Sequence, residues 1–170
     1  VQTGAKTILI HTGYGSKASE RQLEHYDLEN GRPLVDNLLK IGLAPSQIDL
    51  VVLTHMHFDH AGGCTFLDDS KKLRPTFPRA RYVVQRRDRE DTGADLPELA
   101  GTYGDRDVVL LEDAGLMDLI DGDATLLPGL SARLTGGHTR GHQMFLLGEG
   151  KERALYVGDL CPSAVHLSTF

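Results

Sequence analysis

A buried strand that runs directly into a histidine cluster constrains this chain more than any other feature. Residues 48–54, IDLVVLT, contain an unbroken apolar run of the type that lies inside a sheet covered on both faces. Three histidines and a carboxylate follow within six residues, and they are His55, His57, Asp59 and His60. Active sites of α/β proteins cluster at such strand ends. The sequence therefore predicts an α/β fold with a chemical centre at the end of this strand.

The spacing of these four side chains predicts a metal centre. On a strand end that continues extended, His55 and His57 project to the same side, as two ligands of one metal must. Asp59 and His60 follow where the chain turns before a glycine pair, so they aim at a different point a few ångströms away. This difference in direction indicates a second metal beside the first.

Two weaker signals stand later in the chain. GGHTRGH, residues 136–142, places His138 in a tight loop between glycines, and YVGDL, residues 156–160, ends a predicted strand with Asp159. Alone, each pattern is more typical of a turn than of a ligand. A two-metal centre needs a further imidazole and a carboxylate able to bridge the metals, and so both residues join the candidates.

The rest of the chain alternates strand and helix patterns. Lys6–Ile10 is a predicted strand before the glycine-rich HTGYGS, residues 33–41 have helical spacing, and residues 80–85 predict another strand. Residues 86–91 indicate a solvated helix face or loop, and residues 93–107 a long loop over the site. The C-terminal third predicts six short strands, at 108–111, 116–120, 125–127, 130–134, 144–147 and 154–157.

Composition limits the partners. The 170 residues suit one domain, 1–170, and the net charge of −6 gives no basic surface for nucleic acid or anionic lipid. No apolar run approaches the roughly 20 residues of a membrane span. We therefore expect a small-molecule substrate and no membrane. The two cysteines, Cys64 and Cys161, are too few for a disulfide framework in a domain of this size. This favours a reducing compartment and therefore a cytoplasmic location.

The motifs together carry a resemblance. The order THxHxDHxGG, GGHTxGH and a strand ending in GD resembles the metallo-β-lactamase-fold hydrolases, and HFDHAGG with GHTRGHQ is similar to their acyl-homoserine lactone lactonase and methyl parathion hydrolase branch. The resemblance implies an α/β fold, the αββα sandwich. It also implies the metal ligands: one zinc on His55, His57 and His138, another on Asp59 and His60, and Asp159 as the bridge.

This chain departs from the pattern at three places. The family usually has aspartate at the position of His11, where it supports the metal site, and proline at the position of Gly137. Its last histidine ligand lies well beyond the GD strand, where this chain has only His166. The family fold also begins with strands that would precede Val1. We therefore expect an incomplete sandwich, without the N-terminal strands and the C-terminal strand and helix.

The remaining polar residues have simpler interpretations. His142, four residues after His138, is more typical of a structural hydrogen-bonding partner than of a ligand. His25 is expected at the surface, and His166 either lines a pocket or lies at the surface. Tyr14 in the GYG sequence is expected to be a turn residue.

The resemblance implies hydrolysis of an ester, lactone or related bond by a hydroxide held between two metals, with Asp59 orienting that nucleophile. Two zinc ions are expected, the second held more weakly, with iron or manganese as alternatives. β-Lactam cleavage, thioester hydrolysis of the glyoxalase II kind and phosphotriester cleavage stay open. The alternative outside the enzyme class is a truncated metal-binding fragment with little catalysis, which forms homo-oligomers through its exposed strand edges.

Overall fold

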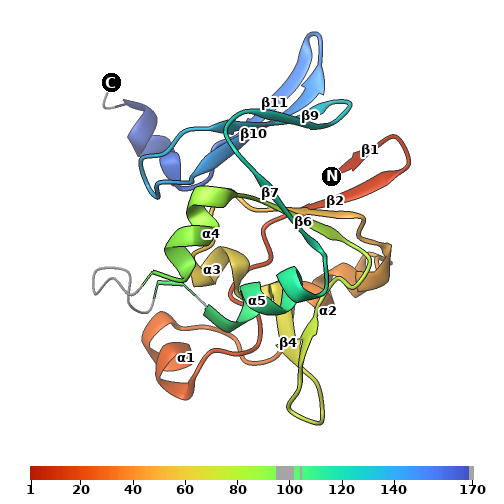
Figure 1. Ribbon diagram of the computed structural model, residues 1–170, viewed down its shortest axis with the longest axis vertical. Helices are drawn as coiled ribbons and strands as arrows, with labels where there is room; N and C mark the ends of the chain where they lie inside the picture. Colours follow the sequence, from red (N-terminus) through yellow and green to blue (C-terminus); the bar gives the residue numbers. More distant parts are fainter. Residues whose placement is uncertain (95–101, 104, 169–170) are drawn as a thin grey trace.

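Two sheets and a set of helices form the molecule, which a computed structural model describes over residues 1–94, 102–103 and 105–168 (Figure 1). The first sheet has the strand order β1-β2-β3-β6-β7, and its strands are Gln2–Thr3, Lys6–Ile10, Leu50–Val52, Arg81–Gln85 and Met117–Ile120. The second has the order β11-β10-β9-β8, with strands Glu152–Tyr156, Gln143–Glu149, Leu130–Leu134 and Ala124–Leu127. A small hairpin pairs β4, Thr65–Leu67, with β5, Leu73–Pro75.

The central strand β3 explains why the two layers pack. β3 pairs in parallel with β2 and β6, and all three of its residues are buried. Alternate side chains of a strand point to opposite faces. Val51 accordingly joins the core between the sheet and the helices, while Val52 joins the core that faces the second sheet and contains Phe145. The expectation of a strand covered on both faces is confirmed.

Five α-helices are described: α1, Glu20–Tyr26; α2, Pro33–Lys40; α3, Phe58–Ala61; α4, Arg86–Thr92; and α5, Asp105–Asp113. Short 3₁₀ turns are also described, at Pro45–Gln47 (η1), Gly62–Cys64 (η2), Gly158–Leu160 (η4) and Ala164–Ser168 (η5). Arg89 of α4 donates two hydrogen bonds to the carboxylate of Glu112 on α5, at 2.9 and 2.7 Å, and ties the two helices together.

Most of the expected elements are present, and two expectations are wrong. Residues 108–111 are not a strand but part of α5, where Val108 and Leu111 are buried three positions apart, as on one helix face. Residues 86–91 are helical, yet this segment is not a solvated face, because Asp88 and Asp91 are buried. Of the loop expected over the site, residues 95–101 and 104 lie outside the described residues, and α5 begins at Asp105.

The five expected strands after α5 are confirmed as β7 to β11, and all form hydrogen-bonded ladders. Among the described residues, no helix has both the length and the apolar character needed to cross a bilayer.

Candidate metal centre

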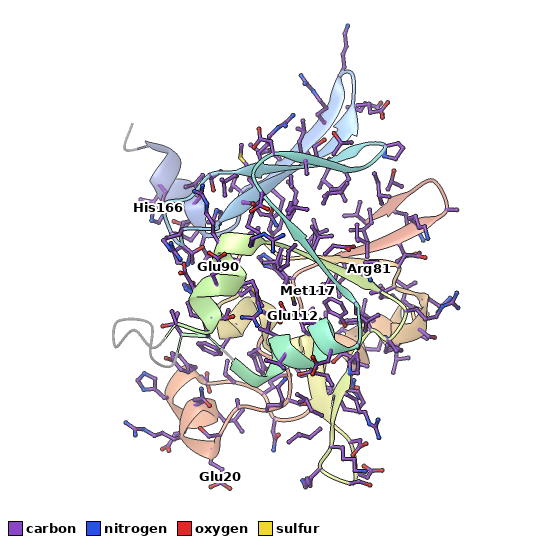
Figure 2. The ribbon with its side chains drawn as sticks, viewed as in Figure 1. Glu20, Arg81, Glu90, Glu112, Met117 and His166 are labelled. Atoms are coloured by element: carbon purple, nitrogen blue, oxygen red, sulfur yellow. The ribbon has the colours of Figure 1, made fainter. Side chains whose placement is uncertain are left out.

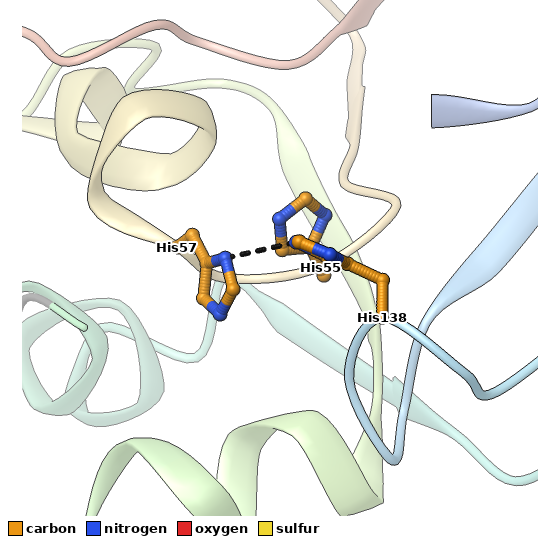
Figure 3. A group of neighbouring side chains, drawn as sticks. All are labelled: His55, His57 and His138. Carbon is orange, nitrogen blue, oxygen red and sulfur yellow. Dashed lines mark hydrogen bonds between the residues drawn. The ribbon is translucent and has the colours of Figure 1, made fainter. Parts of the chain in front are cut away.

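The histidine motif lies where β3 ends and α3 begins. His55 is fully buried just beyond the strand, and His57 is the N-cap of α3, so one ring stands at the exit of the strand and the other at the start of the helix. The loop that follows β9 brings His138 to the same point, and Figure 3 shows the three rings converging. One nitrogen from each ring lies within 4.8 Å of the others. The structure thus joins two residues of the first motif with a histidine about 80 positions away.

A second group of donors shares His55 with the first. One ligand atom from each of His55, His60 and Asp159 lies within 4.8 Å of the other two. Oδ2 of Asp159 is 3.3 Å from Nε2 of His60 and 3.6 Å from Nε2 of His138. A single carboxylate oxygen therefore reaches imidazoles of both groups, as a bridging ligand must.

Asp59 belongs to neither group, although it lies beside the second. Its Oδ2 is 3.3 Å from Nε2 of His60, and about half of its side chain is exposed. The hydrogen bond with His60 holds the pKa of Asp59 below its ordinary value. The carboxylate is therefore charged at neutral pH and stands at the open side of the centre.

The donor set fits divalent metal ions. Nε2 of His55 is buried and has no hydrogen-bond partner among the described residues, and such an orphaned nitrogen is satisfied by a metal. Nε2 of His138 lies only 3.1 Å from Nδ1 of His57. Burial and the neighbouring His138 lower the pKa of His57 to about 4, and burial lowers that of His55 further. Neutral imidazoles are the form that binds metal.

Hydrogen bonds behind the ligands select the nitrogens that face the metals. Nδ1 of His60 is 2.8 Å from Nδ1 of His11, and Nε2 of His11 is 2.9 Å from Oγ1 of Thr54. Oγ1 of Thr54 is also 2.9 Å from Nδ1 of His55. If Nδ1 of His55 carries its proton, the Nε2 atom of His55 is free to bind metal. The Thr54 N–H donates to Nε2 of His11 at 3.2 Å, so the neutral His11 carries its proton on Nδ1 and donates it to Nδ1 of His60. His60 then carries its own proton on Nε2, which a bound metal would displace. Burial, with the nearby His60, lowers the pKa of His11 to about 4.

The model of the metallo-beta-lactamase superfamily matches residues 1–169. The chain belongs to this superfamily. Among its curated relatives, an N-acyl homoserine lactonase from Bacillus cereus is 28% identical over 153 residues, which cover 86% of this chain and 52% of that protein. This metallo-β-lactamase chain therefore spans about half the length of the curated relative it matches.

Solved structures agree with the assignment. A probable metal-dependent hydrolase from Staphylococcus aureus has a TM-score of 0.84 and 28% identity, covering 97% of this chain and 58% of that one. AidC, described as a dizinc quorum-quenching lactonase, has a TM-score of 0.68 and 24% identity, covering 94% of this chain and 54% of its own. The expected metallo-β-lactamase fold and its likeness to the lactonase branch are confirmed.

Helix α4 fixes both ligand loops of this metallo-β-lactamase domain. The buried carboxylate of Asp88 accepts a hydrogen bond from the backbone N–H of Met56, which stands between two candidate ligands. Gly141 packs so closely on the same residue that an added Cβ would lie 2.4 Å from the Asp88 nitrogen. Arg140 donates from Nε to both oxygens of Asp91, at 2.9 and 3.0 Å. The loop carrying His138 is therefore held against α4 by both contacts.

Sequence reasoning missed these supports. Asp88 and Asp91 stand three positions apart in a run of mixed charge, RRDRED, which looks like an ordinary exposed helix. Their spacing places both on one helix face, and that is the only signal the sequence holds. Burial raises the pKa of Asp88 to about 6.

Replacing Asp88 tests this positioning role. Asp88→Ala removes the acceptor of the Met56 N–H, and we expect zinc affinity to fall by about 10–100-fold, the usual effect of losing an outer support of a metal site. Asp88→Asn keeps an acceptor oxygen and should retain most of the affinity. Competition with a chromogenic chelator measures both. If zinc affinity fell equally in Asp88→Ala and in the exposed control Asp121→Ala, Asp88 would have no positioning role.

The remaining histidines lie outside both donor groups. His142 is fully buried, its Nδ1 is 2.7 Å from Oγ1 of Thr135, and its Nε2 has no hydrogen-bond partner among the described residues, so its structural role stays a prediction. His166 lies on η5 at the end of the described chain (Figure 2), exposed, with Nδ1 2.8 Å from Oγ of Ser163. His25 is exposed on α1 as expected. Tyr14 lies in a bend next to the turn at residues 15–16, as expected, and its hydroxyl donates to the Glu29 carbonyl oxygen at 3.1 Å.

His142→Ala distinguishes a structural histidine from a ligand. We expect this variant to bind the same number of zinc ions as the wild type and to lose about 1–3 kcal/mol of unfolding free energy, because it breaks a buried hydrogen bond. Elemental analysis and thermal unfolding measure the two effects. Loss of one zinc equivalent would show that His142 is a ligand.

Proposed function

We propose that this chain is a two-zinc hydrolase that cleaves an ester or lactone bond of a small molecule. The observation that supports this most directly is the shared donor geometry, in which Oδ2 of Asp159 lies 3.3 Å from His60 and 3.6 Å from His138. In this proposal His55, His57 and His138 hold the first zinc, and His60 and Asp59 hold the second. Asp159 joins the two sites.

Bound zinc would supply a hydroxide nucleophile at neutral pH and polarise the carbonyl that is attacked. The residues of the chain supply the geometry. Asp59, ionised and half exposed, accepts a hydrogen bond from the attacking water and orients it. His60 has a raised pKa in the metal-free protein, because Asp59 and Asp159 outweigh the opposing effect of burial. The same two carboxylates would attract the second cation.

Aromatic side chains stand beside the centre and suit a substrate with an apolar part. The ring of Tyr103 is 5.0 Å from that of His57, with the two rings roughly perpendicular, and residue 103 forms an isolated β-bridge with residue 57. Phe58 follows His57 directly, and its ring is 5.4 Å from that of Tyr26 on α1. The curated relatives are N-acyl homoserine lactonases, whose name describes an apolar acyl group beside a lactone. We therefore place acylated lactones first among the substrates.

A substrate panel tests the proposal. We expect the zinc-loaded chain to hydrolyse an N-acyl homoserine lactone and an aryl ester, to lose this activity when a chelator removes the metal, and to recover it when zinc is returned. A chromogenic cephalosporin, a thioester and a phosphotriester complete the panel. If the chain hydrolyses one of these three compounds and does not hydrolyse the lactone, the proposed substrate class is wrong.

The same experiments also test the alternative that this chain is a truncated metal-binding fragment with little catalysis. All five residues of the edge strand β11 are exposed, which is the feature that hypothesis needs. A chain that holds two zinc ions, elutes as an oligomer in gel filtration and turns over no substrate in the panel would establish it and refute the hydrolase.

A further inference from the structure

A second cavity lies apart from the metal centre, and none of the candidate ligands lines it. Its walls are the loop at residues 12–16, the first turn of α2, and the segment that runs from η2 into β4. Its volume is about 140 Å³. An apolar protein cavity of about 150 Å³ accommodates benzene. The space therefore suits a molecule with a body of about one ring or a short alkyl chain.

The wall between the cavity and the metal motif is tightly packed backbone. The Gly63 N–H donates to the Gly13 carbonyl oxygen at 2.9 Å, and the Thr12 N–H donates to the His60 carbonyl oxygen at 2.7 Å. A Cβ added to Gly63 would lie 2.1 Å from the Thr12 oxygen. The glycines therefore bring the loop against η2, and a ligand in the cavity would not touch the metals.

One guanidinium at this cavity has no carboxylate partner. Arg32 is half-buried, and its guanidinium carbon lies 3.8 Å from the centre of the Phe66 ring. No ion pair reaches it from the parts of the chain that the structure describes. Burial lowers its pKa below the ordinary value, and the nearby Asp36 carboxylate acts in the opposite direction. A desolvated guanidinium that stacks on an aromatic ring is a strong donor for a planar anion.

The first turn of α2 adds further donors beside Arg32. Arg32 is the N-cap of the helix, and no side chain caps the turn. Leu34 and Val35, the second and third helical residues, line the cavity. Their N–H groups have no acceptor within the helix, and a helix N-terminus favours an anion. The carboxylate of Asp36 also lies in this first turn, so a ligand would have to be held against its charge.

Two buried threonines also line the cavity. Oγ1 of Thr65 and Oγ1 of Thr76 have no hydrogen-bond partner in the described parts of the chain. Thr65 is fully buried, and Thr76 is 5% exposed. Both oxygens are closed off from water, so a ligand in the cavity would contact these two residues through other atoms.

We propose that this cavity binds a small organic monocarboxylate. The carboxylate would lie between the Arg32 guanidinium and the first turn of α2, and the apolar body would occupy the space beside Leu34 and Phe66. This site is independent of the hydrolytic reaction. It is an anion site on a chain whose net charge is −6, so local donors rather than overall charge must hold the ligand.

Calorimetric titration of the zinc-loaded full chain with benzoate tests the site. Benzamide has the same ring without the charge, and acetate has the charge without the ring, so each should bind at least tenfold more weakly than benzoate. In Arg32→Met we expect benzoate affinity to fall at least tenfold. The matched control is Arg153→Met on the exposed strand β11, which should bind as the wild type does.

A carboxylate could also bind to the zinc ions, and one variant separates the two sites. Benzoate bound in the cavity should remain in His57→Ala, whereas benzoate bound at the metals should be lost. Binding can also be followed in the wild type by nuclear magnetic resonance, because benzoate in the cavity should shift the methyl signals of Thr65 and Thr76. Binding that survives Arg32→Met and disappears in His57→Ala, or unshifted threonine signals at saturation, would overturn the proposal.

Discussion

His57→Ala is expected to lower turnover of the lactone and the aryl ester by more than about 100-fold, because it removes a ligand of the first zinc. Loss of an outer support of a metal site alone costs about 10–100-fold in affinity or activity, and a direct ligand should cost more. His57 stands at the start of α3, with Nδ1 3.1 Å from Nε2 of His138.

The matched control for this variant is His25→Ala, which changes an exposed histidine on α1. Steady-state rates and the zinc content of both variants should be measured on the same preparations. The control should keep the wild-type values of both. If His57→Ala kept its zinc and its turnover, the assignment of the first metal site would be wrong.

Gly63→Ala should have the largest effect on stability. The added Cβ would lie 2.1 Å from the Thr12 carbonyl oxygen, and the next nearest atoms are the carbonyl carbon and Cβ of Thr12, so no flexible side-chain end is there to move away. Overpacking of this kind costs about 1–3 kcal/mol, occasionally more, and we expect a loss of about 3 kcal/mol in unfolding free energy. The displaced segment leads directly from the histidine motif, so zinc affinity should fall as well.

Gly93→Ala is the control for this second variant. The nearest atom to its added Cβ is the flexible end of Arg89, at 3.5 Å, which is ordinary contact. Chemical denaturation with a shared slope compares the two variants. A Gly63→Ala protein as stable as Gly93→Ala would show that the loop at residues 12–16 does not pack on η2 as described.

Local patterns predicted the part of the site that lies within one motif. The apolar run of β3 and the histidines after it are close in sequence, so the strand, its burial and the position of His55 and His57 followed from periodicity. His138 and Asp159 were weak signals on their own, and it was the family motif that joined them to the first cluster. The structure then places them within reach of it.

The predictions that failed depended on contacts between distant segments. The run at 108–111 is short and apolar, and such a run can be a strand or a buried helix turn until its packing partners are known. Asp91 is buried because Arg140, 49 positions later, pairs with it. No local pattern contains that partner, so a charged run appeared solvated.

Zinc stoichiometry tests the central claim most directly. The chain should be dialysed against excess zinc, freed of unbound metal and measured by elemental analysis together with its protein concentration. The shared donor geometry of His55, His60, His138 and Asp159 predicts two equivalents per chain, the second with the lower affinity. One equivalent or none at saturating zinc would contradict a dinuclear centre.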